Sequence, residues 1–507
     1  MSDFLDSWGL SLAIFLPLAG AAVMLLIPRA QEETHKWVAL VTTLATAAVG
    51  VLLLANFDYD NTGVLQFQVD ESWIPLIDSR YHVAIDGMSL PLIALTLLVV
   101  PLCIIYSWKH FPEPHNPKAF LILILILETG MVGTFCAQDL ILFFVFFEVV
   151  LLPMYFMIGV WGGPNRQYAS IKFFLFTLFG SALMLVSFLA LYFLEGSFQI
   201  PVLAEMAGAD LARTTGLLIF GGMFLGFGIK VPMFPFHTWL PDAHTEAPTV
   251  GSVILAAVLL KLGTYGFIRI AIPVLPDAAS EWAPWIGLLA VIGIIYGALC
   301  CLAQTDMKRL IAFSSVAHMG FVMLGIATLT EFGINAAVFG MVAHGLITGM
   351  LFFIAGSVKD RYHTLEIKRL GGLLISAPRL GWILGLCTMA SLGLPGLAGF
   401  WGEFPAILAA YEPAPMLNQT LFRVLMVVAA LGTVLAAGYL LWLFQRTAFG
   451  TPSEEFVDDP EIVDVKMSEW IAWTPMIVLI VVLGFLPSII FDVTNPAATL
   501  IAVAAGA

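Results

Sequence analysis

Three ionisable residues lie inside apolar runs that are long enough to cross a lipid bilayer: Glu148, Lys230 and Lys261. Placing an ionisable side chain at the centre of a bilayer costs from about 2.5–3.5 kcal/mol on insertion scales to ~10 kcal/mol or more in simulations. Such residues are rare in membrane spans and usually mark a pathway for ions or protons. We therefore take these three residues as candidates for proton translocation.

Glu148 and a lysine could act as an acid–base pair. Glu148 has only apolar neighbours in the sequence, from Phe143 to Leu152. Burial favours the neutral form of a lone carboxyl or amine, and an opposite charge nearby restores the charged form. Lys230 and Lys261 are both available as the partner. A pair whose protonation states differ little in energy suits a proton relay. The alternative is a static ion pair between helices, although a buried static pair contributes doubtful net stability.

Two histidines and a second glutamate extend this set toward the C-terminus. His318 and His344 lie in neighbouring apolar runs, and histidine in water changes its charge near physiological pH. A single buried histidine is usually structural, but two of them between Lys261 and Glu403 favour a relay. Glu403 follows a glycine- and proline-rich interruption, where unwound backbone can admit water. Glu128, in an earlier run, is equally compatible with proton transfer and with helix packing.

The segment 236–246 carries His237 and His244 and superficially resembles a metal site. Its prolines predict a turn at the membrane surface instead, and the two histidines are seven residues apart, so we expect no metal there. Proton uptake from the cytoplasm is the more plausible role for His244. The sequence has no P-loop, dinucleotide fingerprint or nucleophile elbow, and its five cysteines show no C-x-x-C spacing. We expect no cofactor and no metal in this chain.

Composition indicates the elements that must position these residues. Hydrophobic residues make up 60% and charged residues 11% of the 507, whereas globular domains have about 25% charged residues. The net charge is −14, and the sequence has no basic patch of the kind that binds nucleic acid. Runs of about 20 apolar residues recur along the whole chain, too long for barrel strands. We predict an all-α integral membrane protein with about fourteen transmembrane helices. Their approximate limits are 10–27, 37–55, 88–107, 119–136, 139–160, 171–194, 214–236, 249–270, 284–303, 309–328, 332–357, 380–410, 421–445 and 470–491.

Two of these spans should be broken helices. Pro232 and Pro235 follow Lys230 in the seventh span, and the run 393–396 interrupts the twelfth just before Glu403. Proline removes a backbone donor and glycine loosens the helix, so both spans should unwind locally. Interrupted spans at matching places in two halves indicate a transport site. The broken seventh span is the fourth in the set of spans 4–8, and the broken twelfth span is the fourth in the set of spans 9–13. Because five is odd, the sets would be inverted repeats.

This pattern divides one polytopic membrane domain into four parts. We predict N-terminal spans 1–3 in 1–117, a first repeat in 118–270, a second repeat in 284–447, and an acidic cytoplasmic loop with the last span in 448–507. Of the 21 lysines and arginines, two lie within spans and most of the others share one side of the membrane, which should be cytoplasmic. Four lie on the other side: Arg80, Arg213, Arg269 and Arg423. Both termini should therefore lie outside, with the chain in a bacterial inner membrane.

Three longer motifs carry a family resemblance. The segment from Gly228 to His244, continuing to Leu260–Gly263, resembles the signature of the antiporter-like membrane subunits of respiratory complex I, the proton-pumping NADH–quinone oxidoreductase. Ser314–Gly320 and Tyr81–Ser89 match further segments of that family. The similarity covers essentially the whole chain. L- and N-type members usually carry lysine near the second helix break, whereas this sequence has Glu403.

The resemblance implies roles for the candidate residues. Glu148 and Lys230 correspond to the family's ion pair, Lys261 with His318 and His344 to its central polar axis, and Glu403 to its terminal proton-release group. The family implies two half-channels that meet at the membrane midplane and are driven by quinone reduction elsewhere. NADH, FMN, iron–sulfur clusters and quinone would lie in partner subunits. The partners would be other membrane subunits of complex I, especially neighbouring antiporter-like subunits.

The function expected from the sequence is therefore a proton-translocating subunit without redox chemistry of its own, within an NADH:quinone oxidoreductase that acts as a translocase. The nearest alternatives are a cation/proton antiporter subunit of the Mrp type and a membrane subunit of a related hydrogenase. A further alternative is a scaffold protein whose buried charges only hold helices together. The sequence does not determine the proton stoichiometry or the order of the transfers.

Overall fold

The computed structural model describes residues 4–108, 110–457 and 459–506, which are almost entirely helical. Twelve helices of the described chain are long and apolar enough to cross a membrane, and two broken helices bring the spans to fourteen. In chain order the spans are η1 with α2 (Leu5–Gly9, Leu10–Leu26), α3 (Glu32–Asn56), α4 (Leu90–Ser107), α5 (Pro117–Cys136), α6 with α7 (Leu140–Val149, Leu151–Trp161), α8 (Arg166–Glu195), α10 with α11 (Arg213–Lys230, Trp239–Glu246), α12 to α14 (Thr249–Val274), α15 (Pro276–Leu302), α16 (Met307–Ala327), α17 (Glu331–Tyr362), α19 with α20 (Pro378–Ser391, Ala398–Ala409), α21 (Gln419–Ala448) and α22 (Met467–Phe485). Helices satisfy their own backbone hydrogen bonds in lipid, which explains this architecture. The predicted all-α membrane fold is confirmed.

Both predicted helix breaks are present. The helix α10 ends at Lys230, and the chain turns over residues 231–238 before α11 begins at Trp239. Pro232 and Pro235 lie in this turn, where they have no backbone N–H to offer a helix. Between α19 and α20, Gly393 and Gly396 have φ angles of +79° and +93°, a conformation that strongly favours glycine.

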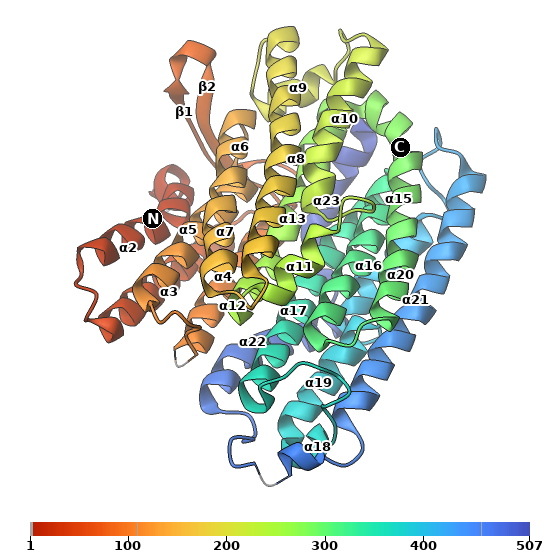
Figure 1. The fold of residues 1–507 in the computed structure, drawn as a ribbon. Helices are drawn as coiled ribbons and strands as arrows, with labels where there is room; N and C mark the ends of the chain where they lie inside the picture. Colours follow the sequence, from red (N-terminus) through yellow and green to blue (C-terminus); the bar gives the residue numbers. More distant parts are fainter. Residues whose placement is uncertain (1–3, 109, 458, 507) are drawn as a thin grey trace.

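The two sets of five spans have the same arrangement. In each set, helices that follow one another in the chain pack together, and the last helix returns to contact the first: α13 (Leu260–Gly266) packs on α5, and α21 packs on α15. The broken helix is fourth in both sets. Because an odd number of crossings separates equivalent spans, the two sets run in opposite directions through the bundle. Figure 1 shows the first set in orange to yellow-green and the second in green to blue.

The segment between spans 2 and 3 forms a β-hairpin. It contains strands β1 (Gln66–Ile74) and β2 (Ser79–Ile85), which pair antiparallel with Val69 opposite Val83. Asp139 holds the hairpin, because its carboxylate accepts hydrogen bonds from Ser79 Oγ and Arg80 N, both at 3.0 Å. We call this the hairpin end of the molecule; it also carries the short helix α9 (Ile200–Met206). The opposite end carries α18 (Leu373–Ser376) and the segments 449–457 and 459–466 (Figure 1).

The last predicted span ends earlier than expected. The sequence placed it at 470–491, but α22 ends at Phe485 and a separate helix, α23, runs from Ser488 to Ala504. Pro487 separates the two, since proline disfavours a helical conformation in the residue before it. The helix α23 packs on α17. Hydropathy thus predicted this last span correctly but placed its C-terminal end incorrectly.

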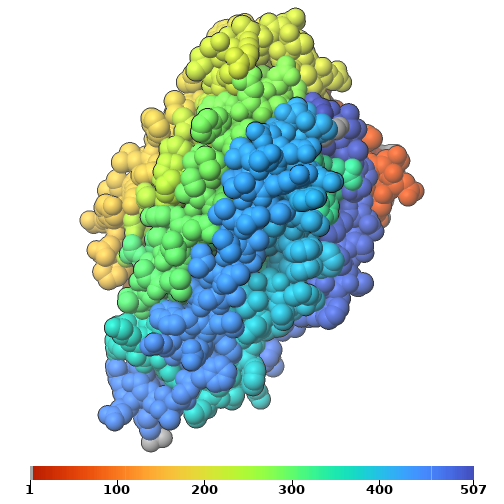
Figure 2. Space-filling model, turned by 90° about the vertical axis from the view of Figure 1, so that its right-hand side faces the viewer, coloured from red at the N-terminus to blue at the C-terminus, as the bar shows by residue number. Residues whose placement is uncertain are grey.

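The spans differ greatly in how far they are buried. In the most apolar stretch of α17 every residue is buried, and in that of α16 94% are, against 28% for α3 and 33% for α21. Figure 2 shows α21 as a long ridge across one face of the molecule, outside the helices that it covers. The helix α17 contacts α4, α12, α16, α19, α20, α22 and α23 and is therefore the centre of the bundle.

Candidate proton-translocation site

Lys261 lies in an irregular span. Two π-helical turns, η3 (Leu255–Leu259) and η4 (Phe267–Ala271), flank α13, and such turns often occur at functional sites. The fully buried Nζ of Lys261 donates a hydrogen bond to the carbonyl oxygen of Ala256 at 2.5 Å and lies 2.7 Å from Nδ1 of His344 on α17. Lys261 therefore joins the first set of spans directly to the central helix.

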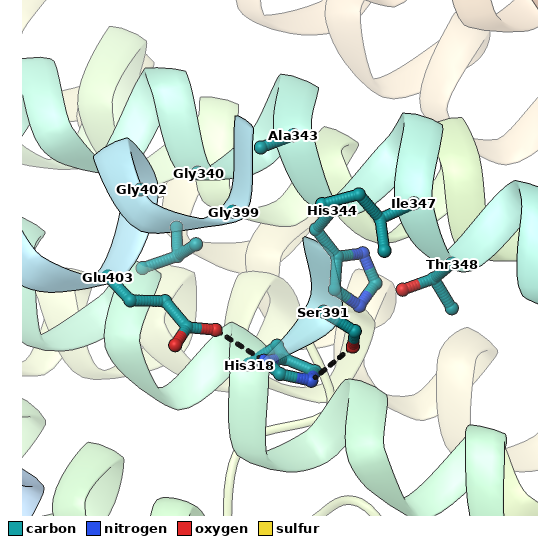
Figure 3. Close-up of a pocket in the computed structure, with 11 residues that line it drawn as sticks. His318, Gly340, Ala343, His344, Ile347, Thr348, Ser391, Gly399, Gly402 and Glu403 are labelled. Carbon is teal, nitrogen blue, oxygen red and sulfur yellow. Dashed lines mark hydrogen bonds and ion pairs between the residues drawn. The ribbon is translucent and has the colours of Figure 1, made fainter. Parts of the chain in front are cut away.

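From His344 the polar groups continue through the second set of spans. The ring centroids of His344 and His318, on α16, are 5.9 Å apart. His318 Nδ1 lies 2.5 Å from Glu403 Oε1 on α20, and its Nε2 lies 3.1 Å from Ser391 Oγ and 3.3 Å from the Tyr439 hydroxyl. Figure 3 shows this group, with His318 between Glu403 and Ser391 and with His344 above. Four of the six predicted site residues thus form one contiguous row.

A small cavity lies on this row. It has a volume of about 20 Å³, and it is lined by apolar and glycine residues together with His318, His344, Thr348, Ser391 and Glu403 (Figure 3). A water molecule needs roughly 10–15 Å³ and two to four polar partners. Among the described residues, His344 Nε2 and Glu403 Oε2 are buried without a hydrogen-bond partner. The cavity therefore has room for a water molecule that would connect them.

One wall of the cavity depends on a close helix contact. A Cβ atom built on Gly402 of α20 would lie 2.5 Å from the Cα of Gly340 on α17. Any larger residue would thus meet backbone, which cannot move aside as a flexible side chain can. The pair of glycines brings α20, and with it Glu403, against the central helix.

Glu148 and Lys230 form a second, separate group. Glu148 is near the end of α6 and only partly buried, whereas Lys230 is 2% exposed at the last position of α10. Lys230 and the Ser181 hydroxyl are the groups that act electrostatically on Glu148. The amine of Lys230 lies 4.6 Å from the ring centroid of Phe147 and has no hydrogen-bond partner among the described residues.

The structure assigns the two lysines to different neighbours. No ion pair within 4.0 Å joins Glu148 to either lysine in the described part of the chain. Lys230 is nevertheless the neighbour of Glu148, and Lys261 is the neighbour of His344. The sequence left both lysines open as the partner of Glu148; Glu148 and Lys230 lie near one another at the first helix break, apart from the row of Lys261.

The two histidines of segment 236–246 face different neighbours. His237 stacks on Phe234, with ring centroids 5.8 Å apart, and meets Tyr296 edge to face, with ring centroids 5.0 Å apart. His244 is fully buried and stacks at 4.5 Å on Phe352 of α17. Over residues 4–108, 110–457 and 459–506, no group of three or more His, Cys, Asp or Glu side chains could hold a metal ion.

A larger polar cavity is lined by the residues that follow His244 in the chain, from Glu246 to Val250. Its volume is about 340 Å³, and its lining includes Glu246, Lys308, Lys359 and Asp360. Lys308 donates a hydrogen bond to the carbonyl oxygen of Ala247 at 2.5 Å, and the charges of Lys308 and Lys261 both act on His244. His244 is therefore influenced by one lysine that lines this cavity and by the lysine at the start of the row.

Sequence reasoning missed Ser181, Ser391 and Tyr439. Tyr439 is fully buried in α21, in the middle of a predicted span. A tyrosine in such a place needs a partner for its hydroxyl, and this was the available signal. The serines gave no signal, because serine is common in membrane helices, where its hydroxyl can bond to the backbone of the preceding turn.

Comparison with known protein families identifies the class of protein. Residues 137–438 match the profile described as NADH:quinone oxidoreductase/Mrp antiporter, TM, and residues 12–134 match the amino terminus of NADH-ubiquinone oxidoreductase chain 4. These matches define an antiporter-like membrane subunit. The chain is 42% identical to NADH-quinone oxidoreductase subunit M of Rhodobacter capsulatus, over 96% of this chain and 95% of the relative, and 39% identical to subunit M of Rickettsia bellii, over 96% of both. The chain belongs to the family of subunit M of NADH-quinone oxidoreductase.

Solved structures agree with this assignment. A chain of respiratory complex I from Thermus thermophilus with bound NADH has a TM-score of 0.86 and 30% sequence identity, covering 98% of this chain and all of that one. A chain of the Mrp complex from Dietzia has a TM-score of 0.82 at 20% identity, covering 97% of this chain and 52% of that one. The second likeness shows a shared fold and nothing more.

Proposed function

We propose that this chain is a membrane subunit of a proton-translocating NADH–quinone oxidoreductase, in which it carries protons and performs no redox chemistry. The observation that carries the proposal is the contiguous row Lys261–His344–His318–Glu403. A cavity large enough for one water molecule adjoins the last three of these residues. Each member can both accept and release a proton, and neighbouring members lie within hydrogen-bond or ring-contact distance. The subunit M relatives support the assignment to that complex.

The geometry suggests how protons move along the row. Lys261, when protonated, can give a proton to His344 Nδ1 across their 2.7 Å contact. His344 can then release its other proton from Nε2, which has no hydrogen-bond partner among the described residues, to a water molecule in the cavity that His344 lines. The water can pass a proton to Glu403, whose Oε2 has no other partner among the described residues. Ser391 and Tyr439 hold His318 so that its Nδ1 stays directed at Glu403.

Glu148 and Lys230 would act as the switch for this row. The amine of Lys230 has no hydrogen-bond partner among the described residues. No hydrogen bond therefore fixes its protonation state, which can respond to the charge on Glu148. We propose that quinone reduction in partner subunits, which hold the NADH, FMN, iron–sulfur clusters and quinone, changes the field at this pair. A charge on Lys230 disfavours a charge on Lys261, since like charges repel in a medium of low dielectric constant.

The orientation follows the distribution of basic residues. The hairpin end would face outward and the opposite end, with the 340 Å³ cavity, would face the cytoplasm of a bacterial cell. Protons would enter through that cavity and His244, reach Lys261, and leave from Glu403. The two five-span sets would each supply one half-channel.

The test uses the intact complex in vesicles, with a Glu148→Gln variant in this chain. We expect the complex to assemble and the number of protons pumped per NADH oxidised to fall strongly, because the switch pair loses its negative charge. The matched control is Glu205→Gln, which changes an exposed glutamate on α9. Normal pumping by Glu148→Gln would refute the proposal.

A cation/proton antiporter is the second candidate, favoured by the family profile, which also covers Mrp antiporters. Vesicles containing the complex would then exchange sodium for protons without NADH or quinone. Sodium-dependent exchange that Glu148→Gln abolishes would favour the antiporter. Its absence, with pumping driven by NADH, would favour the oxidoreductase subunit.

A further inference from the structure

Glu128, in the middle of α5, is a buried acid that the row described above does not use. Its side chain is 0% exposed, and neither carboxyl oxygen has a hydrogen-bond partner among the described residues. The other glutamates buried near the bundle core are better placed: Glu403 contacts His318, and Glu469 contacts Arg361. Glu128 thus has the most isolated carboxyl of the three.

Such a group is a poor structural element. A buried polar atom without a hydrogen bond destabilises a protein, and an apolar side chain of similar size would pack in its place at no such cost. A carboxyl in these surroundings is neutral and carries its proton without sharing it. A proton that is held in no hydrogen bond is free to be transferred when a base comes within reach.

The position of Glu128 indicates which base this would be. The ring of Phe135 packs at 5.2 Å on Tyr265 of α13, and the Tyr265 hydroxyl donates a hydrogen bond to the Phe135 carbonyl. Glu128 lies two helical turns before Phe135 on the same face of α5. Lys261 lies about one turn before Tyr265 in α13. Spans 4 and 8 run in the same direction, so both residues lie on the same side of the Phe135–Tyr265 contact.

Helix geometry gives the offset between them. At a rise of about 1.5 Å per residue, Glu128 lies about 10.5 Å before Phe135 and Lys261 lies about 6 Å before Tyr265. The Lys261 side chain points back along its helix to the carbonyl oxygen of Ala256, which shortens this difference. By contrast Gly130, which faces Val149 and Val150 beside Glu148, is on the other side of α5. Glu128 therefore lies on the face of α5 that carries the contact with α13, and away from the face that packs beside Glu148.

We propose that Glu128 is a further proton-carrying residue of this subunit, which loads Lys261. The O–H bond of the neutral Glu128 carboxyl breaks and an N–H bond forms on the neutral Lys261 amine, leaving a carboxylate and an ammonium. When Lys261 passes its proton to His344, the carboxylate takes up a proton from the side of His244. Each lysine thereby has its own acid: Glu148 for Lys230 and Glu128 for Lys261. This proposal rests on the proposed function.

The experiment compares Glu128→Gln and Glu128→Leu in the intact complex in vesicles, with Glu205→Gln as the control. We expect both Glu128 variants to assemble and to pump roughly tenfold more slowly, which is less than the 10²–10⁴-fold of an indispensable proton-transfer group because protons can still reach Lys261 from the side of His244. Infrared difference spectra between oxidised and NADH-reduced complex should lose one protonated-carboxyl band in Glu128→Gln.

Other outcomes would overturn the proposal. Wild-type pumping in both variants, with a higher melting temperature for Glu128→Leu, would make Glu128 a packing residue. Failure of Glu128→Gln to assemble would also overturn it, because the amide keeps the shape and removes only the transferable proton. Glu148→Gln separates the two proposals: if it stops pumping while Glu128→Gln does not, only the role of Glu128 fails.

Discussion

Replacing Gly402 with alanine should separate α20 from α17 and stop proton transfer at the end of the row. The added Cβ would lie 2.5 Å from the Cα of Gly340, while ordinary contacts begin at 3.4 Å. Backbone cannot yield as a side chain can, so α20 must shift by roughly 0.9 Å, and overpacking of this kind costs about 1–3 kcal/mol. Glu403 is the next residue and moves with α20.

This shift acts directly on the His318–Glu403 contact. That contact is 2.5 Å long, and a displacement of roughly 0.9 Å would take it beyond the 2.6–3.2 Å in which proton transfer between side chains is efficient. A misplacement of about 1 Å costs up to 10²-fold in rate. We expect Gly402→Ala to lower the rate of proton pumping about 10- to 100-fold while the complex still assembles.

The assay measures proton uptake by vesicles and NADH–quinone electron transfer in the same preparation. The control is Gly438→Ala in α21, since a Cβ at Gly438 would have no atom within 4 Å and alanine is the better helix former. Gly438→Ala should pump as the wild type does. Wild-type pumping by Gly402→Ala as well would refute the argument that this glycine contact positions Glu403.

Two further changes address side chains on α21 and α22. Tyr439→Phe removes the hydroxyl that lies 3.3 Å from His318 Nε2. A neutral hydrogen bond contributes about 1 kcal/mol, so the pumping rate should fall by about tenfold or less. A loss as large as that of Gly402→Ala would contradict the view that Tyr439 only positions His318. Glu469→Gln leaves Arg361 buried without its bidentate partner at 2.7–2.8 Å, which should cost about 3–5 kcal/mol and lower the melting temperature of the complex. The double variant Arg361→Met/Glu469→Leu should melt higher than Glu469→Gln, and equal melting of Glu469→Gln and wild type would show that the pair adds nothing.

The sequence predicted those features that the bilayer itself dictates. Fourteen spans followed from hydropathy because backbone in lipid has few alternatives to the helix. Both breaks followed from Pro232, Pro235 and the glycines around Pro395, since these residues act on the backbone locally. The ionisable residues stood out because nothing else in their spans is charged.

Features that depend on three-dimensional contacts could not be predicted. The π-helical turns beside Lys261 leave no mark in an apolar run, because their hydrogen bonds use only backbone atoms. The β-hairpin of 66–85 depends on Asp139, which lies more than fifty residues away. The partner of each lysine also depends on packing, and hydropathy alone left both Lys230 and Lys261 as possible partners of Glu148.

The full burial of α17 has a consequence for the energetics of charge in this protein. The helix carrying His344 has other helices around it, so an ion on the row is solvated by protein dipoles and by any trapped water, with no hydrocarbon beside it. The free energy of creating that ion should therefore be nearly independent of the acyl-chain length of the surrounding bilayer. Turnover in thin and in thick bilayers should agree wherever the complex remains assembled.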